Sequence, residues 1–425
     1  MLSVRFIAEN RDLVIARLKV KNFDSAGLVD RIIEADLQRR KLKSRLDTGQ
    51  ASVNKLSKEI GALYKTGRKE EADHAKDKTG KLKEDIRKLS AELTAVDRLL
   101  RDLLVQVPNL PHETVPAGML PAENELVREG GVKPVLPTGA MPHWDLARKY
   151  DIIDFELGNK ITGAGFPVYK GKAARLQRSL INFFLDEAVK AGYDEILPPV
   201  LVNEDSAFGT GQLPDKEGQM YHVSEDNLYL IPTAEVPLTN LFRDQIIPFS
   251  ELPRKLTAYT PCFRREAGSY GKDVRGLNRL HQFDKVEIVE VQHPDHSYES
   301  LEAMTSYVES LVVKLGLPYR IMLLCGGDMS FHASKTYDFE VFSAAQGKWL
   351  EVSSVSNFES YQANRMMLRF RDENGKKIYT AHTLNGSALA LPRIMAALLE
   401  NNQTEEGIKI PAALLPYTDF EIIGP

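Results

Sequence analysis

The first hundred residues carry an apolar pattern that differs from the rest of the chain. Apolar or small residues recur three and four positions apart with polar residues between them, which is the a/d spacing of a long helix packed on a partner helix. The first series is Leu28, Ile32, Ala35, Leu42, Leu46, Val53, Leu56, Ile60 and Leu63; the second is Leu82, Ile86, Leu89, Leu93, Val96, Leu100 and Leu103. A turn signal, Thr66-Gly67-Arg68, separates them. The pattern predicts an antiparallel coiled-coil hairpin over residues 28–104, with legs of about 50–60 Å.

Prolines mark the end of this hairpin. Val107-Pro108-Asn109-Leu110-Pro111 is followed by Pro116 and Pro121, which is typical of a linker. We therefore expect an N-terminal domain over residues 1–108 and a second domain over residues 109–425.

The second domain alternates helix-like and strand-like segments without βαβ regularity. The spacing of Leu176, Leu180, Phe183 and Phe184 predicts a helix over residues 172–190. Residues 285–291 and 319–324 are short and β-rich, and residues 341–342 are expected to pair with 349–355. These features predict an α+β fold, an antiparallel sheet with helices packed on it.

Composition narrows the function classes. The chain has 425 residues, 43% hydrophobic and 27% charged, as in ordinary soluble proteins, and a net charge of −4 argues against a globally basic nucleic-acid coat protein. The hairpin is locally basic, with 19 Lys and Arg against 14 Asp and Glu in residues 28–104. Such a rod suits either a dimerisation or spacer coiled coil, or a surface that binds backbone phosphates.

The low cysteine content points to a reducing cytoplasm, and the spacing of the histidines bears on zinc binding. Cys262 and Cys325 allow no disulfide framework and no four-cysteine zinc site. His281, His332 and His382 lack ligand spacing, so we expect no zinc. Neither a signal peptide nor an apolar run of about 18 residues is present, so we expect no membrane association.

Two arginine-bearing stretches supply candidate chemistry. Residues 263–268 read Phe-Arg-Arg-Glu-Ala-Gly, and residues 279–287, after a polar loop, read Arg-Leu-His-Gln-Phe-Asp-Lys-Val-Glu. Taken as two strands, they would place Arg264 beside Glu266, and Arg279 beside Phe283 and Glu287. Guanidinium groups bind phosphate through paired N–H donors, and an aromatic ring can stack on a base. A charged hairpin whose arginines pair with its own glutamates is the other interpretation.

Three further segments add candidate ligands. Residues 385–393 end in Leu391-Pro392-Arg393, which predicts a helix start with Arg393 in the first turn, where anions are favoured. Thr233-Ala234-Glu235 is compatible with a helix N-cap or a polar pocket. Residues 351–357 carry a carboxylate and hydroxyl groups, which suit Mg²⁺ or a plain acidic edge strand.

Taken in order, these segments resemble the class II aminoacyl-tRNA synthetases, and among them the seryl-tRNA synthetases. Residues 259–287 resemble motif 2, residues 383–399 resemble motif 3, and residues 190–199 resemble motif 1, the family's dimer element. Thr233-Ala234-Glu235 and residues 209–214, Gly-Thr-Gly-Gln-Leu-Pro, resemble the serine-specific segments. The resemblance covers the whole chain, including the helical arm.

The resemblance implies a class II catalytic domain preceded by a tRNA-binding domain with a coiled-coil arm. It implies a cytoplasmic homodimer that ligates L-serine to tRNA(Ser), and to tRNA(Sec) where present, through seryl-adenylate, using ATP and Mg²⁺. Two other functions are compatible with the same segments. A paralogue could load a non-tRNA acceptor, and a non-catalytic adaptor could retain the fold. A different class II specificity is disfavoured by Thr233-Ala234-Glu235.

The same resemblance assigns roles to individual residues. The catalytic set is Arg264, Glu266, Arg279 and Arg393. The expected ATP-binding residues are Arg264, Arg265, Glu266, Arg279, Phe283, Glu351, Val352, Ser353, Ser354 and Arg393. The expected serine-binding residues are Thr233, Ala234, Glu235, Arg264, Glu287, Asn385 and Ser387. The expected Mg²⁺ ligands are Glu351 and Ser354.

Overall fold

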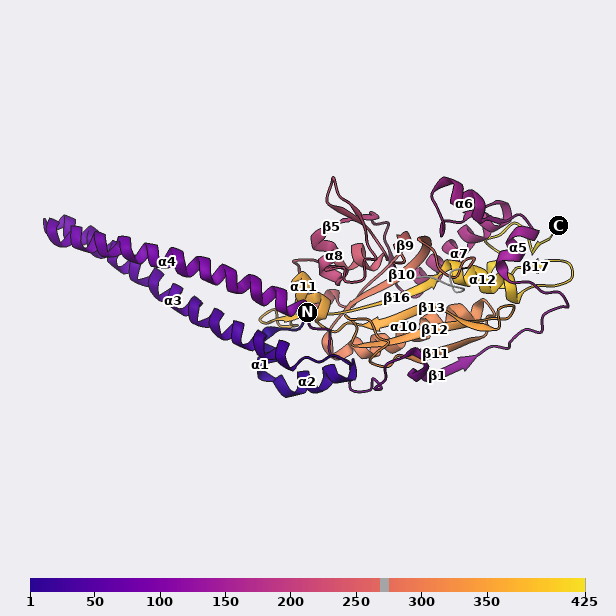
Figure 1. The fold of residues 1–425 in the computed structure, drawn as a ribbon, viewed down its shortest axis with the longest axis horizontal. Helices are drawn as coiled ribbons and strands as arrows, with labels where there is room; N and C mark the ends of the chain where they lie inside the picture. The colour runs from indigo at the N-terminus through magenta and orange to yellow at the C-terminus, as the bar shows by residue number, and fades with distance from the viewer. Residues whose placement is uncertain (268–274, 425) are drawn as a thin grey trace. The chain divides into compact units, whose positions relative to one another are not determined.

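The computed structural model describes residues 1–267 and 275–424, so Gly268 of the motif 2 segment lies outside the described residues. Contacts divide the chain into two compact units. The first comprises Met1–Lys19 and Phe23–Pro108, and the second comprises Val20–Asn22 and Asn109–Pro425. Each unit is described by itself (Figure 1).

The first unit is built from helices. They are α1 (Val4–Glu9), α2 (Arg11–Val20), α3 (Ala26–Lys65) and α4 (Lys69–Leu104). The two long helices run side by side in Figure 1. Tyr64 donates a hydrogen bond to Asp73, and a Cβ on Gly49 would lie 3.1 Å from Ile86. Because later residues of α3 meet earlier residues of α4, the helices are antiparallel, and the predicted hairpin is confirmed.

The interface between α3 and α4 is most buried at its base, where α3 begins and α4 ends. Val29, Ile32 and Leu42 of α3 are buried, as are Val96 and Leu100 of α4. Toward the tip the larger apolar residues are only half-buried, as expected where each helix has a single partner. There α4 also buries small residues that the apolar pattern missed, namely Ala72, Ala75 and Thr79.

The second unit is organised around an eight-stranded sheet. Its strand order is β1-β11-β12-β13-β16-β10-β9-β4, antiparallel except for the β4–β9 pair. The strands are β1 (Glu125–Gly130), β11 (Tyr319–Leu323), β12 (Lys335–Ser343), β13 (Lys348–Asn357), β16 (His382–Ala390), β10 (Gln282–Gln292), β9 (Arg254–Phe263) and β4 (Asp194–Glu195). The predicted α+β class is confirmed, and so is the pairing of residues 341–342 with 349–350.

Three long helices of this unit cover one face of the sheet, here called the helix-covered face. Val286 and Ile288 of β10 share a buried core with α7 (Gly171–Lys190), α10 (Ser297–Lys314) and α12 (Leu391–Asn401). The helix predicted over residues 172–190 is confirmed as α7. On the opposite face, Val289 and Val291 pack in a smaller core with α9 (Glu235–Asn240) and α11 (Tyr361–Met366). On this opposite face, the part of β10 that precedes Val289 carries polar side chains.

Shorter elements complete the unit. The helices are α5 (His143–Lys149), α6 (Phe155–Ile161) and α8 (Glu204–Thr210). The small sheets contain β5 (Leu201–Asn203), β7 (Leu228–Leu230) and β6 (Tyr221–Val223); β15 (Ile378–Thr380), β14 (Arg369–Arg371) and β8 (Ile246–Ile247); β2 (Ile153–Asp154) and β3 (Val168–Tyr169); and β17 (Ile408–Lys409) and β18 (Ile422–Ile423). Within the described ranges, no helix has the length and apolar character needed to span a bilayer.

The strands around the motif 2 loop are shorter at the loop end than predicted. β9 ends at Phe263 and β10 begins at Gln282, so Arg264, Glu266 and Arg279 lie outside the ladder. The backbone of Glu266 has φ +49°, which a strand cannot accommodate. The prediction that these side chains share strand faces is therefore wrong; the chain leaves the ladder before it reaches them.

Candidate active site

One face of the central strands gathers the polar side chains. Lys285 and Glu287 alternate along β10 on the face opposite Val286 and Ile288, whereas Phe283, at the start of the strand, is half-buried and packs against the edge of the helix-covered core. Glu287 is paired with Ser387 of β16, and Asn385 of β16 is paired with Ser356 of β13. Cross-strand partners point to the same side of a sheet. The register therefore carries this polar face across β10, β16 and β13.

A bulge brings Glu351 to the same face as Ser354. On a regular strand, residues three apart point to opposite faces. Here Phe339 of β12 pairs with Ser353, whereas Glu340 pairs with Glu351, so Val352 is an extra residue in β13. The β12 partners of Glu351 and Ser354 are two residues apart and therefore share one face of the sheet. Glu351 and Ser354 consequently share that face as well. The Val352 side chain is buried in the helix-covered core, so this residue could reach ATP only through its backbone.

The motif 2 residues lie together beyond the strand ends. The guanidinium of Arg264 lies 5.3 Å from the ring centre of Phe283, a cation–π contact. Arg279 forms an ion pair of 3.3 Å with Glu266, although the guanidinium remains largely exposed. The backbone N–H of Arg264 donates to His281, which ties the two sides of the loop together. The arrangement leaves one guanidinium group over an aromatic ring and a second one paired with a carboxylate.

Arg393 lies in the first turn of α12, as predicted. Its Nε donates to the carbonyl of Asn278 at 3.0 Å, and its Nη1 donates to the carbonyl of Glu351 at 2.7 Å. The Glu351 carboxylate is 3.6 Å from the same guanidinium. Arg393 therefore connects the end of the motif 2 loop to the bulged strand β13.

The polar face of the sheet contains a buried ion pair. The Lys285 ammonium is 2.5 Å from Glu287, and both side chains are almost fully buried. Thr233 donates a hydrogen bond of 3.0 Å to Glu287 and accepts one from the backbone N–H of Glu235. Thr233 therefore satisfies a backbone N–H at the start of α9 and links this helix start to the sheet.

Glu235 is a buried carboxylate with amide partners. Gln362 of α11 donates to it at 2.6 Å, and Asn385 of β16 also bonds to it. Burial raises the pKa of Glu235 to about 7, and the nearby charge of Glu287 adds to the rise, while the two amides oppose it. A cationic ligand placed here would bind best to the ionised carboxylate.

A second carboxylate flanks the predicted metal ligands. Asp338 of β12 accepts a hydrogen bond of 2.6 Å from Ser354, its cross-strand partner. Burial raises the pKa of Asp338 well above its usual value, and the charge of Glu351 raises it further. Glu351, Ser354 and Asp338 together offer the hard oxygen donors that Mg²⁺ prefers.

The loop that follows α8 is held by α11. Arg365 donates to the carbonyls of Phe208 and Leu213, and Gln362 donates to the carbonyl of Thr210. Gly211 has φ +97°, and a side chain there would collide with His332. The Gly-Thr-Gly-Gln segment is thus fixed next to the residue that bonds Glu235.

Comparisons with known proteins place this geometry in a family. Residues 1–111 match the family "Seryl-tRNA synthetase N-terminal domain", and residues 221–402 match "tRNA synthetase class II core domain (G, H, P, S and T)". The chain is 50% identical to "Serine–tRNA ligase" of Salinibacter ruber over 425 residues, covering 100% of this chain and 99% of the relative. The chain belongs to the seryl-tRNA synthetase family.

Other relatives of this family agree along the whole chain. "Serine–tRNA ligase" of Prosthecochloris aestuarii is 46% identical, with 100% of this chain and 99% of the relative covered. The crystal structure of seryl-tRNA synthetase from Pyrococcus horikoshii complexed with ATP superposes with a TM-score of 0.92 at 33% identity, covering 100% of both chains. The resemblance inferred from the sequence is confirmed.

The structure also shows polar partners of the candidate site residues that sequence reasoning missed. Lys285, Gln362 and Asp338 were not among the expected ligands, yet they bond to Glu287, Glu235 and Ser354 respectively. Lys285 lay inside the motif 2 segment, and its position two residues before Glu287 on a strand was the available signal. Gln362 and Asp338 carried no signal, because their partners lie 127 and 16 residues away.

Proposed function

We infer that the chain is a serine–tRNA ligase, which uses ATP to attach L-serine to tRNA(Ser). The observation that carries this inference is the full-length match to serine–tRNA ligases, together with the buried Thr233–Glu287 and Glu235–Gln362 bonds. The intact polar face disfavours a non-catalytic adaptor, and the arm disfavours a paralogue that loads a non-tRNA acceptor.

We propose that Glu235 binds the ammonium group of serine. Thr233, Glu287, Asn385 and Ser387 complete the serine site, in which Ala234 is fully buried and contributes shape. A pocket lined by buried polar groups favours a substrate whose hydroxyl completes their hydrogen bonds, and rejects an analogue that lacks it.

For ATP, we propose that Phe283 stacks on adenine while Arg264 and Glu266 lie at the α-phosphate. Arg279 and Arg393 contact the outer phosphates. The serine carboxylate then attacks the α-phosphorus and forms seryl-adenylate, with pyrophosphate as the leaving group. The 3′-terminal hydroxyl of the tRNA next accepts the seryl group, and AMP leaves. The protein contributes positioning and charge neutralisation.

Four further residues expected to contact ATP differ in how they could act. Arg265 is exposed, so its guanidinium could reach ATP at the rim of the site. Ser353 donates its hydroxyl to the carbonyl of Ser387, which fixes β13 against β16. The donor set of Glu351 and Ser354, with Asp338 behind them, fits Mg²⁺, which when bound would neutralise phosphate charge.

We also propose a cytoplasmic homodimer that engages tRNA through the hairpin. Leu197, in the motif 1 segment, is 89% exposed and Val189 nearby is 47% exposed, as expected of side chains that a partner subunit covers. Basic side chains on the hairpin suit the phosphates of tRNA(Ser), and tRNA(Sec) is a further proposed acceptor.

The test is amino-acid-dependent exchange of pyrophosphate into ATP by the purified protein. Serine should stimulate exchange, alanine should be poorer by about 10⁴-fold because it leaves the pocket's polar groups unpaired, and threonine should be excluded by its extra methyl group. Comparable stimulation by alanine would contradict the serine site. Charging of tRNA(Ser) transcripts should follow, and sedimentation should give a dimer.

A further inference from the structure

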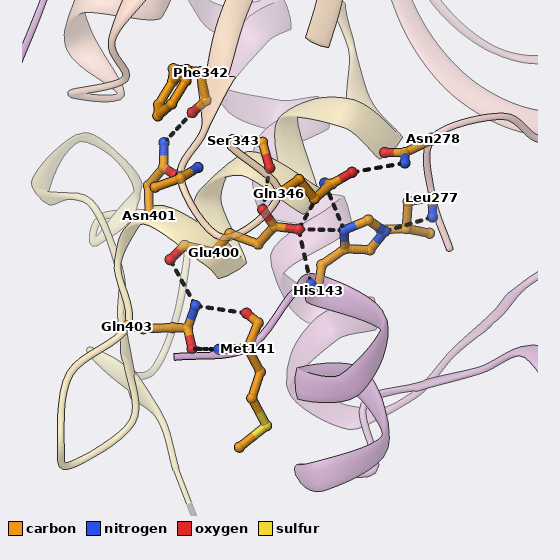
Figure 2. A network of polar contacts seen from close by, with 11 residues as sticks. Met141, His143, Leu277, Asn278, Phe342, Ser343, Gln346, Glu400, Asn401 and Gln403 are labelled. Atoms are coloured by element: carbon orange, nitrogen blue, oxygen red, sulfur yellow. Dashed lines mark hydrogen bonds and ion pairs between the residues drawn. The ribbon is translucent and has the colours of Figure 1, made fainter. Parts of the chain in front are cut away.

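His143 of α5 is a fully buried histidine in a polar network (Figure 2). Its Nε2 lies 2.8 Å from the backbone nitrogen of Leu277, and its Nδ1 lies 2.6 Å from the carboxylate of Glu400. A backbone N–H can only donate, so Nε2 accepts and the proton sits on Nδ1. His143 therefore bridges the carboxylate near the end of α12 to the chain that follows the motif 2 loop.

Glu400 is fully buried and collects several donors. Besides the ring of His143, the backbone N–H of His143 and the Gln346 amide each donate to it at 2.9 Å, and Ser343 donates to its other oxygen. Burial alone would raise the pKa of Glu400, but the bonds from His143 and Ser343 hold this pKa below its usual value. A buried charge with its donors in place makes a rigid support.

The network holds residues 276–278 in place through hydrogen bonds and close packing. The side chain of Asn278 donates to Gln346 at 3.0 Å, and the carbonyl of Asn278 accepts the bond from Arg393. Gly276 has φ +68° and touches the His143 ring so closely that any side chain there would collide with it. This stretch leads directly to Arg279.

α12 connects the support to the site. Arg393 lies in its first turn and Glu400 lies about two turns later, about 10 Å along the axis. A second contact attaches the same stretch of chain to α5. The guanidinium of Arg275 lies 4.7 Å from the ring centre of Trp144, which is next to His143 in the sequence. The first turn of α12 thus carries Arg393. Glu400, near the end of the same helix, anchors the network that holds the Asn278 carbonyl, which accepts a hydrogen bond from Arg393.

We propose that His143 and Glu400 are positioning residues for ATP in the adenylation step. They hold residues 276–278, and thereby set Arg279 and the Asn278 carbonyl that orients Arg393. This inference rests on the proposed function, because those two arginines are assigned there to the outer phosphates. The bonds described for Thr233, Glu235 and Glu287 involve no member of this network, so serine binding should be unaffected.

The experiment measures serine-dependent pyrophosphate exchange in the full-length protein at varied ATP and varied serine. His143→Ala should raise the KM for ATP and lower kcat, a loss on the order of 10–100-fold in kcat/KM for ATP, with the KM for serine unchanged. His143→Gln should recover much of the loss, because its amide oxygen can accept the Leu277 N–H. Equal changes in both KM values, or a loss of kcat alone, would overturn the proposal.

Two variants separate positioning from folding. His382→Ala removes a half-buried histidine, bonded to Ser297 outside the network, and should lower the melting temperature without changing the KM for ATP. Gln346→Ala removes a partly buried amide that bonds both Asn278 and Glu400. It should raise the KM for ATP even if His143→Ala fails to fold, and an unchanged value would refute the inference. Absence of serine stimulation in the wild type would instead refute the proposed function.

Discussion

At the scale of single residues, Glu235 combines burial with a proposed role, binding the serine ammonium group, that needs a charged carboxylate. Its pKa is raised to about 7, so the carboxylate loses its proton only as the pH rises through neutrality. The serine ammonium stays charged over that range, and it should bind the ionised carboxylate. We therefore predict that the KM for serine is about tenfold higher at pH 6 than at pH 8, because the ionised fraction changes by that factor.

Glu235→Gln provides the control for this prediction. The amide keeps the shape and can still bond to Gln362, but it cannot ionise. Its KM for serine should be raised at pH 8, on the order of 10–100-fold, and should show no slope between pH 6 and pH 8. The same slope in wild type and variant would assign the pH dependence to another group.

Arg393 is predicted to depend on its planar fork as well as on its charge. It already bonds two carbonyls, of Asn278 and Glu351, and a lysine could not reproduce both bonds while facing a phosphate. Arg393→Ala should lower exchange by at least about 10²-fold, and Arg393→Lys should restore little of it. Arg254→Ala, which removes a partly exposed arginine at the start of β9, should exchange normally. Near-normal exchange by Arg393→Ala would contradict the assignment.

Sequence reasoning reached the candidate residues that lie in contiguous segments and missed those fixed by distant partners. Arg264, Arg393 and Glu235 stand in segments whose order identifies the family. His143 carried no signal, because its partner Glu400 is 257 residues away and a lone histidine usually packs in a core. Only the fold brings such pairs together.

At the scale of elements, the apolar pattern predicted the helical hairpin well, because a seam repeats over many turns and each turn supports the same periodicity. It placed the sheet class correctly but not the strand ends beside the motif 2 loop. The bulge in β13 shows why. Strict alternation puts Glu351 and Ser354 on opposite faces, and a single extra residue, Val352, reverses that result without leaving a mark in the sequence.

The hairpin itself gives an element-scale prediction. Replacing residues 46–90 by a short Gly/Ser linker removes the half-buried tip and keeps the buried base around Val29, Ile32, Val96 and Leu100. Because the tip is expected to bind tRNA phosphates, serine-dependent exchange should remain near the wild-type rate, whereas charging of tRNA(Ser) should fall by orders of magnitude. Lys81→Glu with Lys83→Glu, two exposed positions on α4, should lower charging in the same direction. Full charging by the shortened protein would show that the hairpin is only a spacer.

At the scale of the whole molecule, catalysis requires two surfaces that bind different ligands. The first unit carries the basic hairpin proposed to bind tRNA, and the second carries the proposed site for ATP and serine. Adenylation needs only the second, and transfer to tRNA needs both. If the enzyme is a homodimer, the hairpin of one subunit could serve either its own site or the partner's site. The family resemblance favours the partner's site.

A mixed dimer distinguishes these two possibilities. One subunit carries the shortened hairpin with an intact site, and the other carries the full hairpin with Arg393→Ala; different affinity tags allow the mixed species to be purified. Each parent homodimer should charge tRNA(Ser) poorly, one for lack of a hairpin tip and the other for lack of adenylate. The mixed dimer should charge it far faster than either parent, because the full hairpin then delivers tRNA to the intact site across the interface. Exchange by the mixed dimer verifies that this site is active, so charging no better than the parents would mean that each hairpin serves its own subunit.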